Sequence, residues 1–265
     1  MISEQYQVFE KQETVQAWDE DYYHPLAQDY YDKAIENLFK LMDIQPGETI
    51  LDAGCGPGVH SIRLAKKNIK VLAIDISKTM LREAQKRVLQ EDVTHLIKFK
   101  EEDLTALSFA DASFKSIFSW GVIIHIKEIE KALDELARVT APGGKLGLYI
   151  TNKNALDHTI ESLARDLLSK HKLAWESLPM GKGIWFDFNN EKLWVWQIDT
   201  TALIKYLEQK NFRLTAHIIG EFTEIQRRLK GVPRTLLLKF NNLCYSLKVS
   251  PNLASTNLLI FEKTQ

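Results

Sequence analysis

The stretch Leu51-Asp52-Ala53-Gly54-Cys55-Gly56-Pro57-Gly58 decides how this chain is expected to fold. It follows a short apolar run and places glycines at three alternate positions. Glycine adopts backbone angles that other residues avoid, and it leaves room for a ligand to approach the main chain. A strand that turns at such a loop into a helix directs the amides of the helix N-terminus toward a ligand. The stretch therefore predicts a nucleotide-binding turn.

Short apolar runs and amphipathic runs alternate on both sides of this loop. Strands are expected at 49–52, 71–75, 97–99, 116–120 and 145–150, and helices at 58–67, 78–90 and 128–139. Strands that alternate with helices indicate a parallel sheet covered on both faces. Two further strands are expected at 212–219 and 256–262. The predicted fold class is α/β, with a Rossmann-like, seven-stranded, mostly parallel sheet and helices on both faces.

The predicted organisation has three parts. Residues 1–45 form an N-terminal helical segment that Pro25 interrupts, because proline disfavours a preceding α conformation. Residues 46–150 form the nucleotide-binding core, and residues 151–265 supply lid insertions plus the last two strands. The insertions comprise a predicted helix at 155–171, an aromatic stretch at 175–196 and a predicted helical segment at 222–251.

Composition narrows the classes of function. The 265 residues carry 34 basic and 35 acidic side chains, a net charge of −1, so no bulk field favours nucleic acid or an anionic membrane. No membrane span is expected, since no apolar run approaches the length that a bilayer requires. The two cysteines, Cys55 and Cys244, favour a reduced, cytoplasmic protein. No spacing of histidines, cysteines and acids suggests a metal site, and the oligomeric state is not predicted.

The spacing of the glycines distinguishes between nucleotide-binding families. In the dinucleotide fingerprint the third glycine follows two intervening residues, whereas here it comes one residue early, at Gly58. Together with Asp52 and four further motifs, the chain resembles the class I S-adenosylmethionine-dependent methyltransferases, in their small-molecule branch related to methyltransferase type 11. The resemblance covers about 46–150. Its further motifs are Ala73-Ile74-Asp75-Ile76-Ser77, Glu101-Glu102-Asp103-Leu104, Glu135-Leu136-Ala137-Arg138-Val139 and Pro142-Gly143-Gly144.

The resemblance implies S-adenosylmethionine as cofactor, S-adenosylhomocysteine as product, and a set of cofactor-binding residues. Asp75 ends the second strand, where a carboxylate accepts hydrogen bonds from the two ribose hydroxyls. The family assigns Ile76 to packing on the adenine, Asp103 to its amino group and the Leu104 amide to a ring nitrogen.

The methionine end of the cofactor is assigned to the glycine loop and two hydroxyl groups. Asp52 and the loop at Gly54, Gly56 and Gly58 lie on the cofactor side, and Ser119 joins them from the end of the fourth strand. Tyr30, in the N-terminal helical segment, is expected to contact the cofactor carboxylate, although packing explains its helical spacing equally well.

His125 is the candidate catalytic residue. It follows the fourth strand, at the edge where ligands bind in such sheets. Imidazole titrates in the range that suits proton removal near neutral pH. Two interpretations stay open: a general base for the acceptor, or a histidine that orders the loop or caps the next helix.

Two features of the C-terminal part also have two interpretations each. The aromatic residues between Trp175 and Trp196 line an acceptor pocket or form the core of a lid. The basic residues Arg227, Arg228, Lys230 and Arg234 bind an anionic group or form a solvated helix face.

The leading hypothesis is transfer of a methyl group from S-adenosylmethionine to a small-molecule acceptor at oxygen or nitrogen, with oxygen slightly favoured. An RNA or protein methyltransferase with the same cofactor domain is the alternative, although no appended nucleic-acid module is visible. A nucleotide-dependent oxidoreductase is the second alternative, disfavoured by the glycine spacing. A binding protein that kept the fold without catalysis is the least favoured, because the cofactor motifs are intact.

Overall fold

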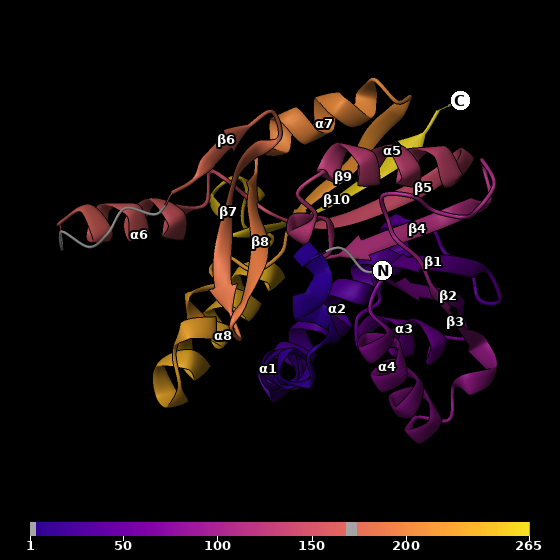
Figure 1. Cartoon of the computed structure of the whole chain (residues 1–265), viewed down its shortest axis with the longest axis horizontal. Helices are drawn as coiled ribbons and strands as arrows, with labels where there is room; N and C mark the ends of the chain where they lie inside the picture. Colours follow the sequence, from indigo (N-terminus) through magenta and orange to yellow (C-terminus); the bar gives the residue numbers. More distant parts are fainter. Residues whose placement is uncertain (1–3, 168–173, 265) are drawn as a thin grey trace.

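The computed structural model describes residues 4–167 and 174–264, which contain one large sheet and one small sheet (Figure 1). The large sheet has seven strands in the order β3-β2-β1-β4-β5-β10-β9, and only β10 runs antiparallel to its neighbours. This confirms the predicted Rossmann-like α/β fold. The strands are β1 (Thr49–Ala53), β2 (Lys70–Asp75), β3 (Ile97–Glu101), β4 (Phe114–Trp120), β5 (Thr140–Thr151), β9 (Phe212–Ile219) and β10 (Thr256–Lys263).

Helices cover both faces of this sheet, and each face has its own apolar core. On one face lie α2 (Pro25–Leu41), α3 (Val59–Ala65) and α4 (Lys78–Gln90), and on the other lie α5 (Ile129–Val139) and α7 (Thr200–Glu208) (Figure 1). Burying apolar side chains on both faces drives this layering. The carboxyl ends of β1, β2 and β4 therefore meet at one edge, where the strand order reverses and ligands bind in such sheets.

The N-terminal segment begins with the 3₁₀ helix η1 (Glu4–Glu10), followed by α1 (Gln12–Tyr22) and α2. Pro25 is the first residue of α2, and His24 caps the helix by accepting a hydrogen bond from the Leu26 amide at Nδ1, at 3.3 Å. Proline suits this position because the missing N–H would have no helical partner there. The predicted break at Pro25 is confirmed, whereas η1 was not expected from the sequence.

The insertion after β5 begins with the predicted helix and continues as strands, which were not predicted from the sequence. Its helix α6 (Leu156–Leu167) lies within the predicted 155–171, of which 168–171 fall outside the described residues. The aromatic stretch then forms a three-stranded antiparallel sheet of β6 (Glu176–Leu178), β7 (Gly181–Phe188) and β8 (Glu191–Ile198), which projects away from the large sheet (Figure 1). The turn between β7 and β8 is Asn189-Asn190, with φ of 51° and 61°, as expected for a tight hairpin.

The second insertion is helical, as expected. It contains η4 (Ile225–Arg228), α8 (Gly231–Ser246) and η5 (Pro251–Leu253), and α8 packs against α2. Two short 3₁₀ turns, η2 (Thr94–Leu96) and η3 (Ile123–His125), complete the described elements. Among the helices of residues 4–167 and 174–264, none combines the length and apolar character needed to cross a bilayer.

Candidate functional site

The three glycines of the loop between β1 and α3 have different roles. All have positive φ: 89° at Gly54, 50° at Gly56 and 82° at Gly58. A Cβ at Gly54 would lie 2.4 Å from the Val122 methyl groups, and one at Gly58 would lie 2.9 Å from the Ala84 Cβ. A Cβ at Gly56 would have no neighbour within 4 Å. Two glycines thus allow close packing, and Gly56 faces open space.

Two buried carboxylates lie beside this loop. The Asp75 carboxylate accepts hydrogen bonds from the Gly56 amide (2.8 Å) and the Ser77 amide (2.9 Å), and burial raises its pKa to about 6. Asp52 accepts a hydrogen bond from the Ser61 hydroxyl, and burial, with the nearby Asp75 charge, raises its pKa to about 7. Each carboxylate has lone pairs left for a ligand, so this end of the site suits hydroxyl donors or positive charge.

A cavity of about 650 Å³ opens at this edge of the sheet, and most of the predicted site residues line it. Its lining includes the catalytic candidate His125 and seven of the expected cofactor-binding residues: Asp52, Gly54, Gly56, Asp75, Ile76, Asp103 and Leu104. The chain thus brings together loop, strand-end and helix-start residues from β1, β2, β3 and β4.

Three expected cofactor-binding residues lie elsewhere. Gly58 packs against α4, as described above. The buried Ser119 hydroxyl donates to the Ala53 carbonyl at 2.9 Å, so it connects β4 with β1. The Tyr30 hydroxyl donates to that of Tyr149 at 3.3 Å beneath the cavity wall, and its neighbour Tyr31 lines the cavity instead. Adjacent residues of a helix point about 100° apart, so Tyr30 and Tyr31 of α2 have different surroundings.

The N-terminal segment covers the expected cofactor side of the cavity. Tyr6 and Phe9 of η1 and Trp18 of α1 line it. The Ser77 hydroxyl donates to the Phe9 carbonyl (2.7 Å) and anchors the segment to the start of α4. The Tyr6 hydroxyl is buried without a hydrogen-bond partner among the described residues, and burial and the nearby Asp103 raise its pKa. A buried hydroxyl that faces the cavity in this way is suited to a ligand's polar group.

Glu10 attaches the same segment to α4 by a second route. Its carboxylate accepts hydrogen bonds from the amides of Lys78 (2.8 Å) and Thr79 (3.2 Å) and from the Thr79 hydroxyl (2.7 Å). Those amides are the unsatisfied donors at the helix N-terminus. The sequence held no signal for this contact, because Glu10 and Lys78 are joined only by the tertiary fold.

His125 lies at the end of η3, and the small sheet orients its ring. Nδ1 is 2.9 Å from the Trp194 carbonyl oxygen on β8. A carbonyl only accepts, so Nδ1 carries the hydrogen and the neutral ring keeps its lone pair on Nε2. Burial lowers the pKa of His125 to about 4, so the ring is neutral at pH 7. This arrangement orders the loop and also leaves a nitrogen able to accept a proton.

The aromatic residues between Trp175 and Trp196 are divided between the cavity lining and the core. Phe186 and Phe188 line the cavity, whereas Trp194 and Trp196 are buried in the core beneath the small sheet. Aromatic side chains from the large sheet also line the cavity. The Trp120 ring stacks on the Tyr149 ring, with centroids 4.1 Å apart, and neither was expected from the sequence.

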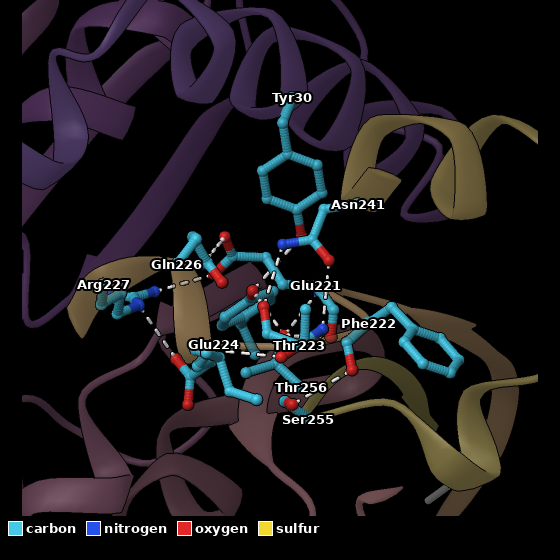
Figure 2. Close-up of polar contacts among 12 residues, drawn as sticks. Tyr30, Glu221, Phe222, Thr223, Glu224, Gln226, Arg227, Asn241, Ser255 and Thr256 are labelled. Carbon is cyan, nitrogen blue, oxygen red and sulfur yellow. Dashed lines mark hydrogen bonds and ion pairs between the residues drawn. The ribbon is translucent and has the colours of Figure 1, made fainter. Parts of the chain in front are cut away.

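Four basic residues also line the cavity: Arg227 and Arg228 of η4, Lys230 directly before α8, and Arg234 in the first turn of α8. Arg227 contacts two carboxylates: Glu221 at 2.8 Å and Glu224 at 3.2 Å (Figure 2). The cavity therefore runs from acidic strand ends to a basic helical segment.

Comparison with known proteins agrees with this geometry. Residues 50–144 match the family model of the methyltransferase domain. Methyltransferase GfsG of Streptomyces halstedii is 32% identical over 118 residues, which are 44% of this chain and 42% of that protein. The 27-O-demethylrifamycin SV methyltransferase of Amycolatopsis mediterranei is 28% identical over 141 residues, 50% of this chain and 52% of that protein. The chain thus spans about half the length of these relatives.

Among solved structures, magnesium protoporphyrin IX methyltransferase from Synechocystis PCC 6803 with bound SAH has a TM-score of 0.64 at 18% identity, covering 97% of both chains. That likeness concerns the fold. The fold, the glycine loop and the family match together define a nucleotide-binding α/β domain of the methyltransferase type. The match over 50–144, the methyltransferase relatives and the shared fold together support a class I S-adenosylmethionine-dependent methyltransferase, with S-adenosylmethionine as its cofactor.

The residues present fit this cofactor. Gly56 leaves open space beside the loop amides, Asp75 offers lone pairs to ribose hydroxyls, and the unpartnered Tyr6 hydroxyl lies on the Asp103 side of the cavity. Cys55, inside the loop, has its pKa raised by burial and by Asp75, so its thiol stays protonated and unreactive.

Proposed function

We propose that this chain transfers the methyl group of S-adenosylmethionine to a small-molecule acceptor, at an oxygen or a nitrogen atom. One observation carries the proposal: a single cavity is lined both by the cofactor-side residues and by residues of the two insertions. Donor and acceptor would therefore share one enclosed space. The named relatives, GfsG and the demethylrifamycin enzyme, are methyltransferases by their printed names, and the second acts on a small molecule.

The cofactor supplies an activated methyl group on a positively charged sulfur. The protein's remaining tasks are to position both partners and to exclude water. Asp75, Asp103 and the glycine loop would hold the nucleoside. The N-terminal segment, fastened by Ser77 and Glu10, would cover it.

His125 is the residue that we assign to proton removal. Its Nδ1 hydrogen is fixed on the Trp194 carbonyl, so Nε2 carries the lone pair. Phe9 and Trp18 pack near its ring, with centroids at 6.0 and 6.3 Å, and shield it from bulk water. The lone pair of the acceptor oxygen or amine nitrogen forms the new bond to the methyl carbon as the carbon–sulfur bond breaks. A neutral imidazole in this position would accept the proton that the hydroxyl group loses during this step, or that the methylated amine loses after it.

The test begins with the cofactor. Isothermal titration of the purified chain with S-adenosylhomocysteine, with NADH as the control ligand, should give binding of the former alone. Methyl transfer is then measured with labelled S-adenosylmethionine against hydroxyl and amine acceptors, with transfer RNA and bulk protein in parallel. Binding of NADH in place of S-adenosylhomocysteine would support an oxidoreductase. Labelling of RNA or protein instead of small molecules would refute the proposed acceptor class.

A further inference from the structure

A row of exposed apolar side chains follows α8 to its C-cap residue. These large side chains are between 42% and 72% exposed: Val232, Leu236, Phe240, Leu243 and Leu247. Steps of three or four residues keep all of them on one face of a helix, within about 80° of arc. Apolar residues scattered singly on a surface need no explanation, whereas these side chains form one continuous row. We call these residues the α8 stripe.

The opposite face of α8 is fixed to the rest of the chain. Cys244 and Tyr245 belong to the apolar core that also contains residues of α2, and the Tyr245 hydroxyl accepts a hydrogen bond from Asn37 Nδ2 at 2.7 Å. Thr223 and Asn241 exchange two hydrogen bonds, of 3.1 and 2.9 Å (Figure 2). α8 lies at the outer edge of the molecule (Figure 1). The helix therefore has a fixed rotation that turns the α8 stripe outward.

The part of the chain that carries the α8 stripe is basic, although the net charge of the whole chain is −1. Residues 225–261 contain six basic side chains and no acid. The arginines among them have partners within the fold. The lysines are exposed and have no carboxylate partner within 4–167 and 174–264: Lys230, Lys239 and Lys248. They lie before, within and after α8, so uncompensated positive charge accompanies the whole stripe.

The chemistry of this face indicates what covers it. A helix with Leu and Phe on one side and lysines beside them is typical of a helix that lies in the interface of a bilayer. The apolar side chains enter the boundary between headgroups and acyl chains, and the long lysine side chains extend their ammonium groups to anionic headgroups. An anionic lipid surface therefore satisfies both features of the face at once.

A protein partner fits this face less well. Residues that dominate the binding energy of protein interfaces are enriched in Trp, Tyr and Arg, and lysine is depleted there. The α8 stripe contains only Val, Leu and Phe. Two copies of α8 related by a twofold axis would bring their lysines together, and 225–261 contains no acid to pair with them.

We propose that the α8 stripe, together with Lys239 and Lys248, docks this protein on the surface of an anionic lipid bilayer, with α8 parallel to the membrane plane. The inference goes beyond the proposed function and does not depend on it, because docking on lipid requires neither the cofactor nor the acceptor. The stripe residues do not line the cavity, whereas Leu229, Lys230 and Arg234 beside them do. Docking would therefore bring lipid to the α8 end of the cavity.

Flotation of the full chain with lipid vesicles tests the proposal. Vesicles of phosphatidylcholine and phosphatidylglycerol in equimolar amounts should carry the chain to the top of a density gradient. The affinity for vesicles of phosphatidylcholine alone should be roughly tenfold or more lower, since each lysine near an anionic surface contributes about fivefold. Binding to the mixed vesicles should weaken as the salt concentration rises.

Two double variants test the apolar and the basic parts separately. Leu236→Gln with Leu243→Gln should lower the affinity for the mixed vesicles about tenfold or more, because two side chains that would enter the lipid become polar. Lys239→Gln with Lys248→Gln should lower it by a similar factor, about fivefold for each lysine. All of these side chains are exposed, so thermal unfolding should stay unchanged.

Leu89→Gln on α4 and Lys205→Gln on α7 are the matched controls. Both side chains are exposed, and both lie on helices outside the α8 stripe. The control variants should bind the mixed vesicles as the unmodified chain does. A loss of binding in either control similar to that of the double variants would show that lipid does not recognise α8 in particular, and the proposal would be wrong.

The remaining outcomes identify what covers the face instead. Absence of flotation, or unchanged flotation of either double variant, would refute docking through α8, and equal binding to both kinds of vesicle would refute the part played by the lysines. A dimer in sedimentation equilibrium that does not float, and that Leu236→Gln with Leu243→Gln converts to a monomer, would assign the stripe to a second copy. Binding of polyglutamate without flotation, abolished in Lys239→Gln with Lys248→Gln, would indicate an acidic protein partner.

Discussion

The cofactor side and the acceptor side of the cavity are built in different ways. On the expected cofactor side, most of the lining comes from strand ends and the turns that follow them within 46–150, so short motifs contain these residues. The N-terminal segment adds Tyr6, Phe9 and Trp18. On the acceptor side, β7, β8, η4 and α8 contribute isolated side chains that only the tertiary fold brings together. Backbone-based sites leave a local signature in the sequence, whereas side-chain-based sites on insertions do not.

The same contrast separates cofactor binding, which every acceptor would need, from selection of the acceptor. The cofactor side would serve any acceptor, and the insertions would select one. Substitutions on the cofactor side should therefore change cofactor affinity for every substrate, whereas substitutions on the acceptor side should change turnover or acceptor choice while the cofactor still binds.

The largest effect is expected at His125, where the two sides meet. His125→Ala should lower the rate of methyl transfer roughly 10²–10⁴-fold, the usual contribution of a general base. Affinity for S-adenosylhomocysteine should stay the same. Because the pKa of His125 is lowered to about 4, the ring is neutral above about pH 5 and its ionisation should not affect the rate there.

His158→Ala is the matched control for that experiment. The His158 Nδ1 also lies near a backbone carbonyl, that of Asn152 at 3.1 Å, but His158 does not line the cavity. Methyl transfer from labelled S-adenosylmethionine, measured for both variants, shows whether His125 acts as a general base. A loss of less than a few-fold in His125→Ala would show that the ring only orders the loop.

The next largest effect is expected at Gly54. Gly54→Ala combines a φ of 89° with a Cβ 2.4 Å from the Val122 methyl groups, so we expect a cost of about 2–4 kcal/mol from strain and overpacking. Thermal unfolding and titration with S-adenosylhomocysteine should show lower stability and weaker binding.

Two further variants separate the causes at Gly54. Gly143→Ala, with a φ of 71° and no neighbour within 4 Å of the added Cβ, measures the backbone cost alone. Val122→Ala in the Gly54→Ala background should recover part of the loss by removing the contacted methyl groups. No recovery would mean that the backbone angle alone sets the cost.

The third prediction concerns Asp75 and the pH dependence of S-adenosylhomocysteine binding. Asp75→Asn should weaken S-adenosylhomocysteine binding by about 1–3 kcal/mol, the scale of hydrogen bonds to a charged group. Burial raises the pKa of Asp75 to about 6, so its carboxylate becomes protonated as the pH falls below 6 and loses acceptor capacity. Affinity in the unmodified chain should therefore fall between pH 6 and 5.

The pH series also contains its own control. In Asp75→Asn the fall between pH 6 and 5 should be smaller, and the part that remains is due to Asp52, whose pKa burial raises to about 7. Asp187→Asn, which replaces an exposed carboxylate outside the cavity, should behave like the unmodified chain. A pH-independent affinity in the unmodified chain would contradict the assigned ribose contact.

These differences explain what the sequence could and could not predict. Alternating strands and helices gave the α/β fold, because burial on two faces imposes that pattern. The hydrogen-bond partners of Tyr30 and Ser119 could not be predicted from the sequence, because they depend on how α2 is rotated and on which strands pair. The β7–β8 sheet was hidden among aromatic residues, although the Asn189-Asn190 turn was a usable hairpin signal.

The smallest effect is expected in the N-terminal segment, which lies outside both the motifs of 46–150 and the two insertions. Glu10→Gln weakens three hydrogen bonds at the start of α4 and removes a negative charge that favours a helix N-terminus. We expect a cost of about 0.5–1 kcal/mol, seen as a few-fold faster dissociation of S-adenosylhomocysteine in stopped-flow fluorescence. Glu13→Gln, an exposed acid on α1 outside the cavity, is the control. Unchanged dissociation would mean that Phe9 and Ser77 alone hold the segment over the cofactor side.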